Sequence, residues 1–81
     1  MKIELYKSAL CPRCAYAAKI LKKLQKEDES IEIITYDITT NLKAFKEAGI
    51  SMIPTLKINE AKISWILPKE KEIRAFIQKH Q

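Results

Sequence analysis

The two cysteines of the chain, Cys11 and Cys14, are separated by only two residues. Within one helical turn, this spacing lets the two sulfur atoms close a disulfide. Such a pair can alternate between a dithiol and a disulfide by exchange with a disulfide or thiol of another molecule. The spacing therefore points first to redox chemistry.

The surroundings of the pair predict different roles for the two thiols. The motif Cys11-Pro12-Arg13-Cys14 stands where a strand pattern gives way to a helical one. A helix N-terminus carries roughly half a positive charge, and cysteines in such settings have pKa values of about 3.5–7.5. We expect Cys11, at the exposed start of the turn, to attack a substrate disulfide, and the more covered Cys14 to resolve the mixed disulfide. Two neighbouring residues are predicted to tune the pKa of Cys11. They are Pro12, which suits a first helical turn, and Arg13, which carries a permanent positive charge.

Other uses of a Cys-x-x-Cys pair compete with this interpretation. A zinc site within one chain needs two further ligands, and the sequence has no other cysteine and a single histidine, His80, beside the end of the last predicted helix. We therefore predict no metal site. A structural disulfide is rare in the cytoplasm, where we expect the protein because its first residues carry no export-signal pattern. A metal or iron–sulfur cluster held between two protomers by Cys11 and Cys14 is the alternative function.

Periodic patterns place the motif between a strand and a helix. Residues Met1–Tyr6 alternate polar and apolar side chains, as a strand does. From Pro12 onward the apolar residues follow a helical spacing, and they are Ala17, Ile20, Leu21 and Leu24. The lysines between Lys19 and Lys26 fall on the opposite face of this predicted helix.

The following segments continue the alternation of strands and helices. Residues Ile31–Asp37 have the composition of a buried strand. A second helix is expected to have its cap within Thr39–Asn41 and to end at Gly49, the only glycine of the chain. Its predicted inward residues are Leu42, Phe45 and Ala48.

A hairpin and a last helix complete the pattern. Leu56 and Ile58 mark a third strand, and Ile63 and Trp65 mark a fourth, with only a few polar residues between them. Pro68 is predicted to open the last helix, whose inward residues are Ile73, Phe76 and Ile77. The order β-α-β-α-β-β-α predicts one α/β domain over residues 1–81, with a four-stranded mixed sheet flanked by helices. Its first two strands enclose a helix and should be parallel.

Composition and charge argue against several classes of protein. The sequence is 47% hydrophobic and 31% charged, which is typical of a folded domain. No apolar stretch approaches the roughly 20 residues that span a bilayer. The net charge of +5 is a moderate excess that in a lysine-rich protein commonly maintains solubility. We expect a monomer with no nucleic-acid partner and no membrane partner.

A second motif, far from the cysteines, resembles a known family. The run Ala48-Gly49-Ile50, followed by Ile53-Pro54-Thr55, is similar to the thioredoxin-superfamily segment that ends a helix and leads into a cis-proline. The resemblance implies a thioredoxin fold in which Pro54 lies against the cysteine pair and the Ile53–Pro54 bond is cis. It also implies that the Ile53 main chain binds an extended substrate segment, as an added strand would. Candidates for apolar contact with the substrate, each of them equally a candidate for the core, are Leu10, Tyr16 and Trp65.

Within that superfamily the chain resembles the small glutaredoxins, through its opening residues Met1–Tyr6 and its Cys-Pro-x-Cys motif. The resemblance implies a reductase of protein disulfides that has no bound cofactor and receives electrons from a reductase or a low-molecular-weight thiol. Two features depart from the glutaredoxin pattern. Ser8 occupies the position of a glutathione-binding lysine, and the stretch Ile63–Pro68 lacks a Gly-Gly pair. These departures predict slow reduction by glutathione.

Overall fold

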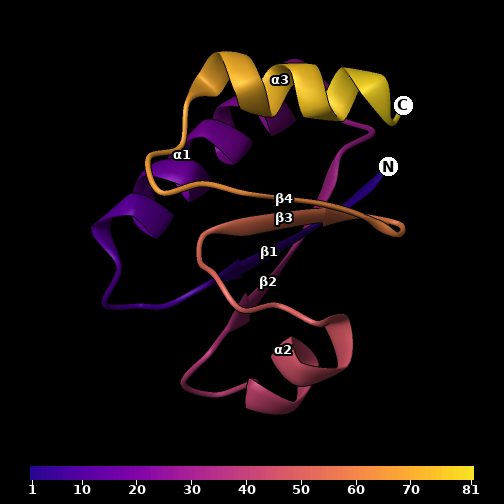
Figure 1. The fold of residues 1–81 in the computed structure, drawn as a ribbon. Coiled ribbons are helices and arrows are strands. Elements are labelled where there is room, and N and C mark those ends of the chain that lie inside the picture. The colour runs from indigo at the N-terminus through magenta and orange to yellow at the C-terminus, as the bar shows by residue number, and fades with distance from the viewer.

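Strands and helices follow one another in the predicted order in a computed structural model, which describes all of residues 1–81 (Figure 1). The strands are β1 (Lys2–Lys7), β2 (Glu32–Asp37), β3 (Thr55–Ile58) and β4 (Ala61–Ser64). The helices are α1 (Pro12–Glu27), α2 (Leu42–Ala48) and α3 (Glu70–Lys79). None of these helices is long and apolar enough to cross a membrane.

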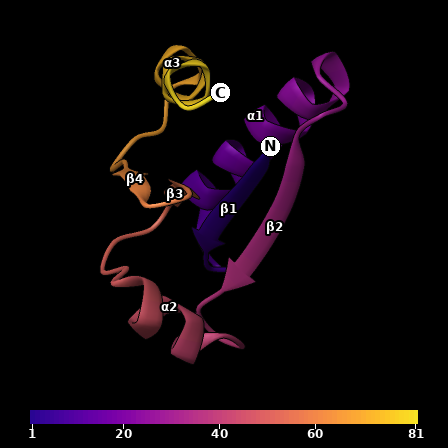
Figure 2. The same cartoon turned by 90° about the vertical axis from the view of Figure 1, so that its right-hand side faces the viewer.

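The four strands form one mixed sheet in the order β2-β1-β3-β4. The strands β1 and β2, which α1 connects, are parallel, and β3 is antiparallel to both β1 and β4. Helices α1 and α3 cover one face of the sheet, and α2 lies on the other side (Figure 1, Figure 2). The predicted fold class, a mixed sheet flanked by helices, is confirmed.

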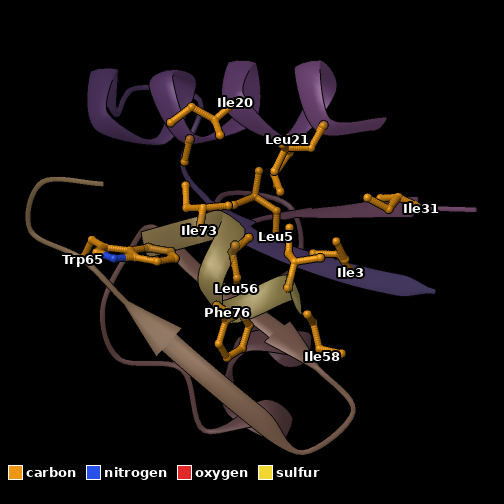
Figure 3. Packing of buried hydrophobic residues seen from close by; sticks show 13 residues of the cluster. Ile3, Leu5, Ile20, Leu21, Ile31, Leu56, Ile58, Trp65, Ile73 and Phe76 are labelled. Atoms are coloured by element: carbon orange, nitrogen blue, oxygen red, sulfur yellow. The ribbon is translucent and has the colours of Figure 1, made fainter. Parts of the chain in front are cut away.

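The main core lies between the sheet and the helices α1 and α3 (Figure 3). Leu5 and Leu56 are opposite each other in the β1–β3 pairing, and both are buried in this core. The inward residues predicted for α1 and α3 are all buried there as well. On the other face of the sheet, the Tyr6 ring stacks on Tyr36 at a centroid distance of 5.0 Å and meets Phe45 edge-on at 5.2 Å. This smaller aromatic cluster attaches α2 to the sheet.

Some local predictions for α2 and α3 are wrong. Leu42, predicted to face inward, is 52% exposed, because the short α2 buries only Phe45. Asn41 is the N-cap of α2, but its side chain makes no capping hydrogen bond. Helix α3 begins at Glu70 rather than at Pro68, which lies buried in the loop before the helix.

Candidate active site

The loop between β1 and α1 places Cys11 immediately before the first residue of the helix. The Cys11 N–H donates to the Ser8 carbonyl at 3.1 Å, and the Leu10 N–H donates to the Ser8 hydroxyl at 3.2 Å. Cys11 is the N-cap residue of α1, and Pro12 is the first helical residue. Proline fits there because the first N–H groups of a helix have no helical acceptor.

The Cys11 sulfur takes the place that a side-chain oxygen usually has at a helix N-cap. It accepts a hydrogen bond from the Cys14 main-chain N–H at a donor–acceptor distance of 3.2 Å. A thiolate accepts such a bond more strongly than a thiol, so the contact favours the ionised form of Cys11. Cys11 is partly exposed, whereas Cys14 is completely buried.

The pKa values of the two thiols move in opposite directions. Partial burial opposes ionisation of Cys11, but hydrogen bonds from Cys14 and the charge of Arg13 outweigh it, and the pKa of Cys11 falls below its ordinary value. Burial, together with the hydrogen bond to Cys11 and the charge of Cys11, raises the pKa of Cys14 to about 11. The pair therefore combines an accessible, readily ionised thiol with a covered, protonated one.

Arg13 connects the cysteine motif to the loop between β4 and α3. Its Nη1 donates to the Ile66 carbonyl at 2.8 Å, although the two residues are 53 positions apart in the sequence. The Arg13 side chain is exposed, and its charge contributes to the lowered pKa of Cys11. The contact with Ile66 could not be read from the sequence, because no periodic pattern relates an exposed arginine to a distant carbonyl.

The segment Ile53–Pro54 lies beside the end of β1. Thr55 pairs with Tyr6 in the antiparallel β1–β3 register, so the residues before β3 run alongside those that follow β1. The Ile53–Pro54 peptide bond is cis, and the Pro54 side chain is buried. The Pro54 carbonyl accepts the Trp65 N–H at 3.2 Å. The main-chain groups of Ile53, in contrast, make no hydrogen bond within the protein.

Of the three residues predicted as candidates for apolar contact with a substrate, two are exposed at the surface and one is buried in the core. Leu10 is 88% exposed and Tyr16 is half exposed. Trp65 is buried in the main core, and its indole N–H donates to a Glu72 carboxylate oxygen at 2.9 Å. Only Leu10 and Tyr16 are therefore available to a substrate.

Three further apolar side chains near these segments are exposed and were not individually predicted: Met52, Ile66 and Leu67. Ile66 and Leu67 follow Trp65 in the loop that Arg13 contacts, and Ile66 is 72% exposed. A sequence signal does exist, because the run Trp65-Ile66-Leu67 does not alternate polar and apolar residues as a half-buried strand would. Its apolar residues therefore cannot all be explained as strand residues facing the core. The prediction that Trp65 belongs to the fourth strand is wrong, since β4 ends at Ser64.

No third metal ligand accompanies the two thiols. The structure has no group of three or more His, Cys, Asp or Glu side chains placed to hold a metal ion. The His80 ring packs against Phe76 at the end of α3, with the ring centroids 4.8 Å apart. A cluster bound at Cys11 and Cys14 would need further ligands from a second chain.

Comparison with known proteins identifies the family. A family model described as a thioredoxin domain matches residues 1–78. The chain belongs to the thioredoxin family. A probable thioredoxin of Archaeoglobus fulgidus is 34% identical over 79 residues, which cover 95% of this chain and 86% of the relative. A thioredoxin of Methanocaldococcus jannaschii is 32% identical over 60 residues, which cover 73% of this chain and 71% of the relative.

Solved thioredoxin structures share the fold of this thioredoxin-family protein. Thioredoxin 1 of Thermosipho africanus matches with a TM-score of 0.81 at 21% identity, covering 98% of this chain and 92% of that one. The thioredoxin of Fasciola hepatica matches with a TM-score of 0.79 at 18% identity, covering 99% and 80%. The predicted thioredoxin-superfamily membership is thus confirmed, and the protein is a thioredoxin-like redox protein.

Reversing the charge of Arg13 is expected to raise the pKa of Cys11 in this thioredoxin-family site. In Arg13→Glu, a carboxylate replaces a cation that stabilises the thiolate, so a smaller fraction of Cys11 is ionised at any pH below its pKa. Because solvent screens an exposed charge, we expect alkylation there to be about threefold slower. The measurement is the pH profile of iodoacetamide reaction, and Lys43→Glu on α2 makes the same charge change elsewhere. Equal profiles for all three proteins would contradict this role of Arg13.

Proposed function

We propose that the protein reduces disulfides of other proteins through a dithiol mechanism, acting as a monomer in the cytoplasm. The observation that carries the proposal is the asymmetry of the two thiols. Cys11 is partly exposed and has a lowered pKa, whereas Cys14 is buried and has a pKa of about 11. Membership in the thioredoxin family supports the same chemistry. Cys11 is the nucleophile and Cys14 is the resolving thiol.

The reaction consists of two exchange steps. The Cys11 thiolate attacks one sulfur of the substrate disulfide, a Cys11–substrate bond forms, and the other substrate sulfur leaves as a thiolate that takes a proton from water. Cys14 then gives up its proton and attacks the Cys11 sulfur, which releases the second substrate thiolate. Two electrons pass to the substrate, and the protein is left with a Cys11–Cys14 disulfide.

Cys14 can act despite its high pKa, because the first step changes its surroundings. The negative charge of Cys11 is one of the causes that raise the pKa of Cys14. When Cys11 is bonded to the substrate that charge is absent, so Cys14 ionises more readily at the moment when its attack is needed. Well-oriented intramolecular groups also react as though present at about 10⁵ M or more.

Ile53 and Pro54 form the proposed binding site for an extended substrate segment. The N–H and carbonyl of Ile53 are free to pair with such a segment as an added strand. Pro54 presents neither an N–H nor a reactive side chain to the substrate. The exposed side chains of Leu10, Met52 and Ile66 supply apolar surface for the flanking residues of the substrate.

The oxidised protein is expected to accept electrons faster from a thioredoxin reductase than from glutathione. Ser8 cannot pair with a glutathione carboxylate, and the stretch Ile63–Pro68 has no glycine whose main chain could hold the tripeptide. Loss of such contacts is expected to slow reduction by about tenfold or more. The measurement supplies the oxidised protein with glutathione or with reductase and NADPH, and follows the appearance of the Cys11 and Cys14 thiols by mass spectrometry.

A matched pair of variants tests the reason for that difference. Ser8→Lys restores the missing charge beside the motif and is expected to speed reduction by glutathione severalfold. Ser30→Lys adds the same charge in the loop between α1 and β2, remote from the cysteines, and serves as the control. Reduction of the unchanged protein by glutathione at the reductase rate would contradict the expectation.

A further inference from the structure

Helix α1 carries most of the positive charge of the protein. It contains Arg13 and four lysines but only one acidic residue, Glu27, which gives a net charge of +4. The whole chain has a net charge of +5, so all the other elements and loops together contribute only +1. The excess is therefore localised on the helix that begins with the cysteine motif.

The lysines of α1 form one stripe on its exposed side. They are Lys19, Lys22, Lys23 and Lys26, all of them exposed, and each has another of these lysines three or four residues away. Tyr16, half exposed and three residues before Lys19, extends the stripe toward the buried Cys14. With a rise of about 1.5 Å per residue, this basic stripe from Tyr16 to Lys26 is about 15 Å long.

The basic stripe borders a shallow groove of about 470 Å³. Besides Tyr16 and the four lysines, Ile20 and the first residue of α3, Glu70, line this groove. Lys23 pairs with Glu70 at 3.2 Å, and Glu70 also accepts a hydrogen bond from Arg74. Lys19, Lys22 and Lys26 have no acidic partner within the protein.

Grouping these positive charges on one side of α1 destabilises the helix, and solubility alone does not require such a grouping. Like charges three and four residues apart on a helix repel one another and destabilise it. A surface that only maintains solubility can mix both signs and spread its excess, as the rest of this chain does. Three unpaired ammonium groups on one stripe instead create a local field that attracts carboxylates.

We infer that the basic stripe is a docking surface for an acidic segment of the protein whose disulfide Cys11 attacks. The inference rests on the proposed reductase function and names the substrate class, namely disulfide proteins with acidic residues beside the reactive cysteine. The stripe begins two residues after Cys14, on the helix that Cys11 caps, so a substrate segment that extends from Cys11 along α1 would lie over the lysines. Tyr16 adds an apolar contact at the end nearer the dithiol.

A protein partner fits the groove better than a nucleic acid does. Single-stranded nucleic acids bind to basic grooves in which several aromatic side chains stack on the bases. This groove has a single aromatic residue, Tyr16, so it lacks the set of aromatic side chains on which successive bases would stack. The redox chemistry beside the stripe also requires a disulfide, which a nucleic acid lacks.

The test compares two disulfide-bridged peptides that differ only in four residues flanking one cysteine, glutamates in one and glutamines in the other. At about 20 mM salt, where screening is weak, we expect kcat/KM to favour the acidic peptide by about tenfold. At about 0.5 M salt the preference should fall to less than about twofold. Equal values for the two peptides at low salt would overturn the inference while leaving the reductase function intact.

Charge-reversal variants test whether the preference for the acidic peptide arises from the basic stripe. Lys22→Glu/Lys26→Glu should abolish or invert the preference for the acidic peptide. The control Lys43→Glu/Lys46→Glu makes the same charge change on α2, across the sheet, and should keep the preference. Thermal melts establish that each variant is folded. If both double variants lose the preference equally, net charge rather than the stripe is responsible and the inference is wrong.

Binding without turnover separates the two proposals. Fluorescence anisotropy of labelled peptides with the Cys11→Ser/Cys14→Ser protein should show tighter, salt-sensitive binding of the acidic peptide. If the acidic peptide binds preferentially but the unchanged protein reduces neither peptide, the docking surface stands and the reductase function fails. A single-stranded RNA oligonucleotide that binds more tightly than the acidic peptide, and is released by Lys22→Glu/Lys26→Glu, would assign the stripe to nucleic acid and overturn the inference.

Discussion

A Cys14→Ser protein is expected to stall as a stable mixed disulfide between Cys11 and its substrate. The substitution keeps the partly exposed nucleophile and the main-chain N–H of residue 14 that donates to its sulfur, but it removes the thiol that would release the substrate. Cys11→Ser should form no such adduct and should lose dithiol reductase activity by about a thousandfold or more, because the nucleophile is one member of a unit. Mass spectrometry of each variant with a disulfide-bridged peptide, without reductant, measures the adduct and its site.

The two variants control for each other, since each exchanges one sulfur for oxygen in the same motif. In the Cys11→Ser protein, Cys14 should react with the peptide far more slowly than the partly exposed Cys11 does in the reverse variant, because Cys14 is completely buried. An adduct on Cys14 in the Cys11→Ser protein, formed as fast as that on Cys11 in the reverse variant, would exchange the two roles. A Cys14→Ser protein that forms no adduct through Cys11 would contradict the assignment of Cys11 as the nucleophile.

Truncating Leu56 to alanine is expected to cause the largest loss of stability. Leu56 lies in the central strand β3, opposite both Leu5 and Ile63, and its exposed fraction is 0%. Buried Leu→Ala substitutions cost about 3–5 kcal/mol because they lose transfer free energy and leave a cavity. The total free energy of unfolding of a domain of this size is about 4–12 kcal/mol. Urea unfolding followed by circular dichroism should show the midpoint falling by about a quarter or more.

Leu42→Ala is the matched control for that loss, because it removes the same atoms from a side chain that is 52% exposed. The change should alter the free energy of unfolding by no more than about 0.5 kcal/mol, since alanine is also the better helix former. A loss at Leu42 comparable to that at Leu56 would show that the short α2 depends on contacts of this leucine.

The residues of α1 explain why so much of the fold could be predicted. Its apolar side chains recur at a helical spacing, and proline stands at the one turn that tolerates it, so pattern and local chemistry agree. The same agreement holds for α3, where every predicted inward residue is buried. The two cysteines could be placed at a helix start because the strand pattern before them ends abruptly.

The predictions that failed concern residues whose environment is set by few contacts. Leu42 fits an inward helical pattern, but a helix of seven residues has room for only one buried position, which Phe45 takes. Pro68 looks like the first residue of a helix, yet it is buried in the loop before Glu70. Contacts such as Arg13 with Ile66 depend on how distant loops meet, and that information is distributed over the whole fold.

The antiparallel pairing of β1 with β3 affects when the site is completed during synthesis and folding of the chain. On the ribosome, Cys11 and Cys14 are synthesised well before Ile53 and Ile66. The Ile66 carbonyl meets Arg13, and Ile53 comes alongside the residues that follow β1, only after distant segments have paired, as Thr55 does with Tyr6. Such long-range pairings form late, because the intervening chain must first be closed into a loop. A nascent or unfolded copy would therefore carry the thiols before the residues proposed to bind the substrate are in position. Under the proposed function, selectivity among disulfides would arise only when the last third of the polypeptide is in place.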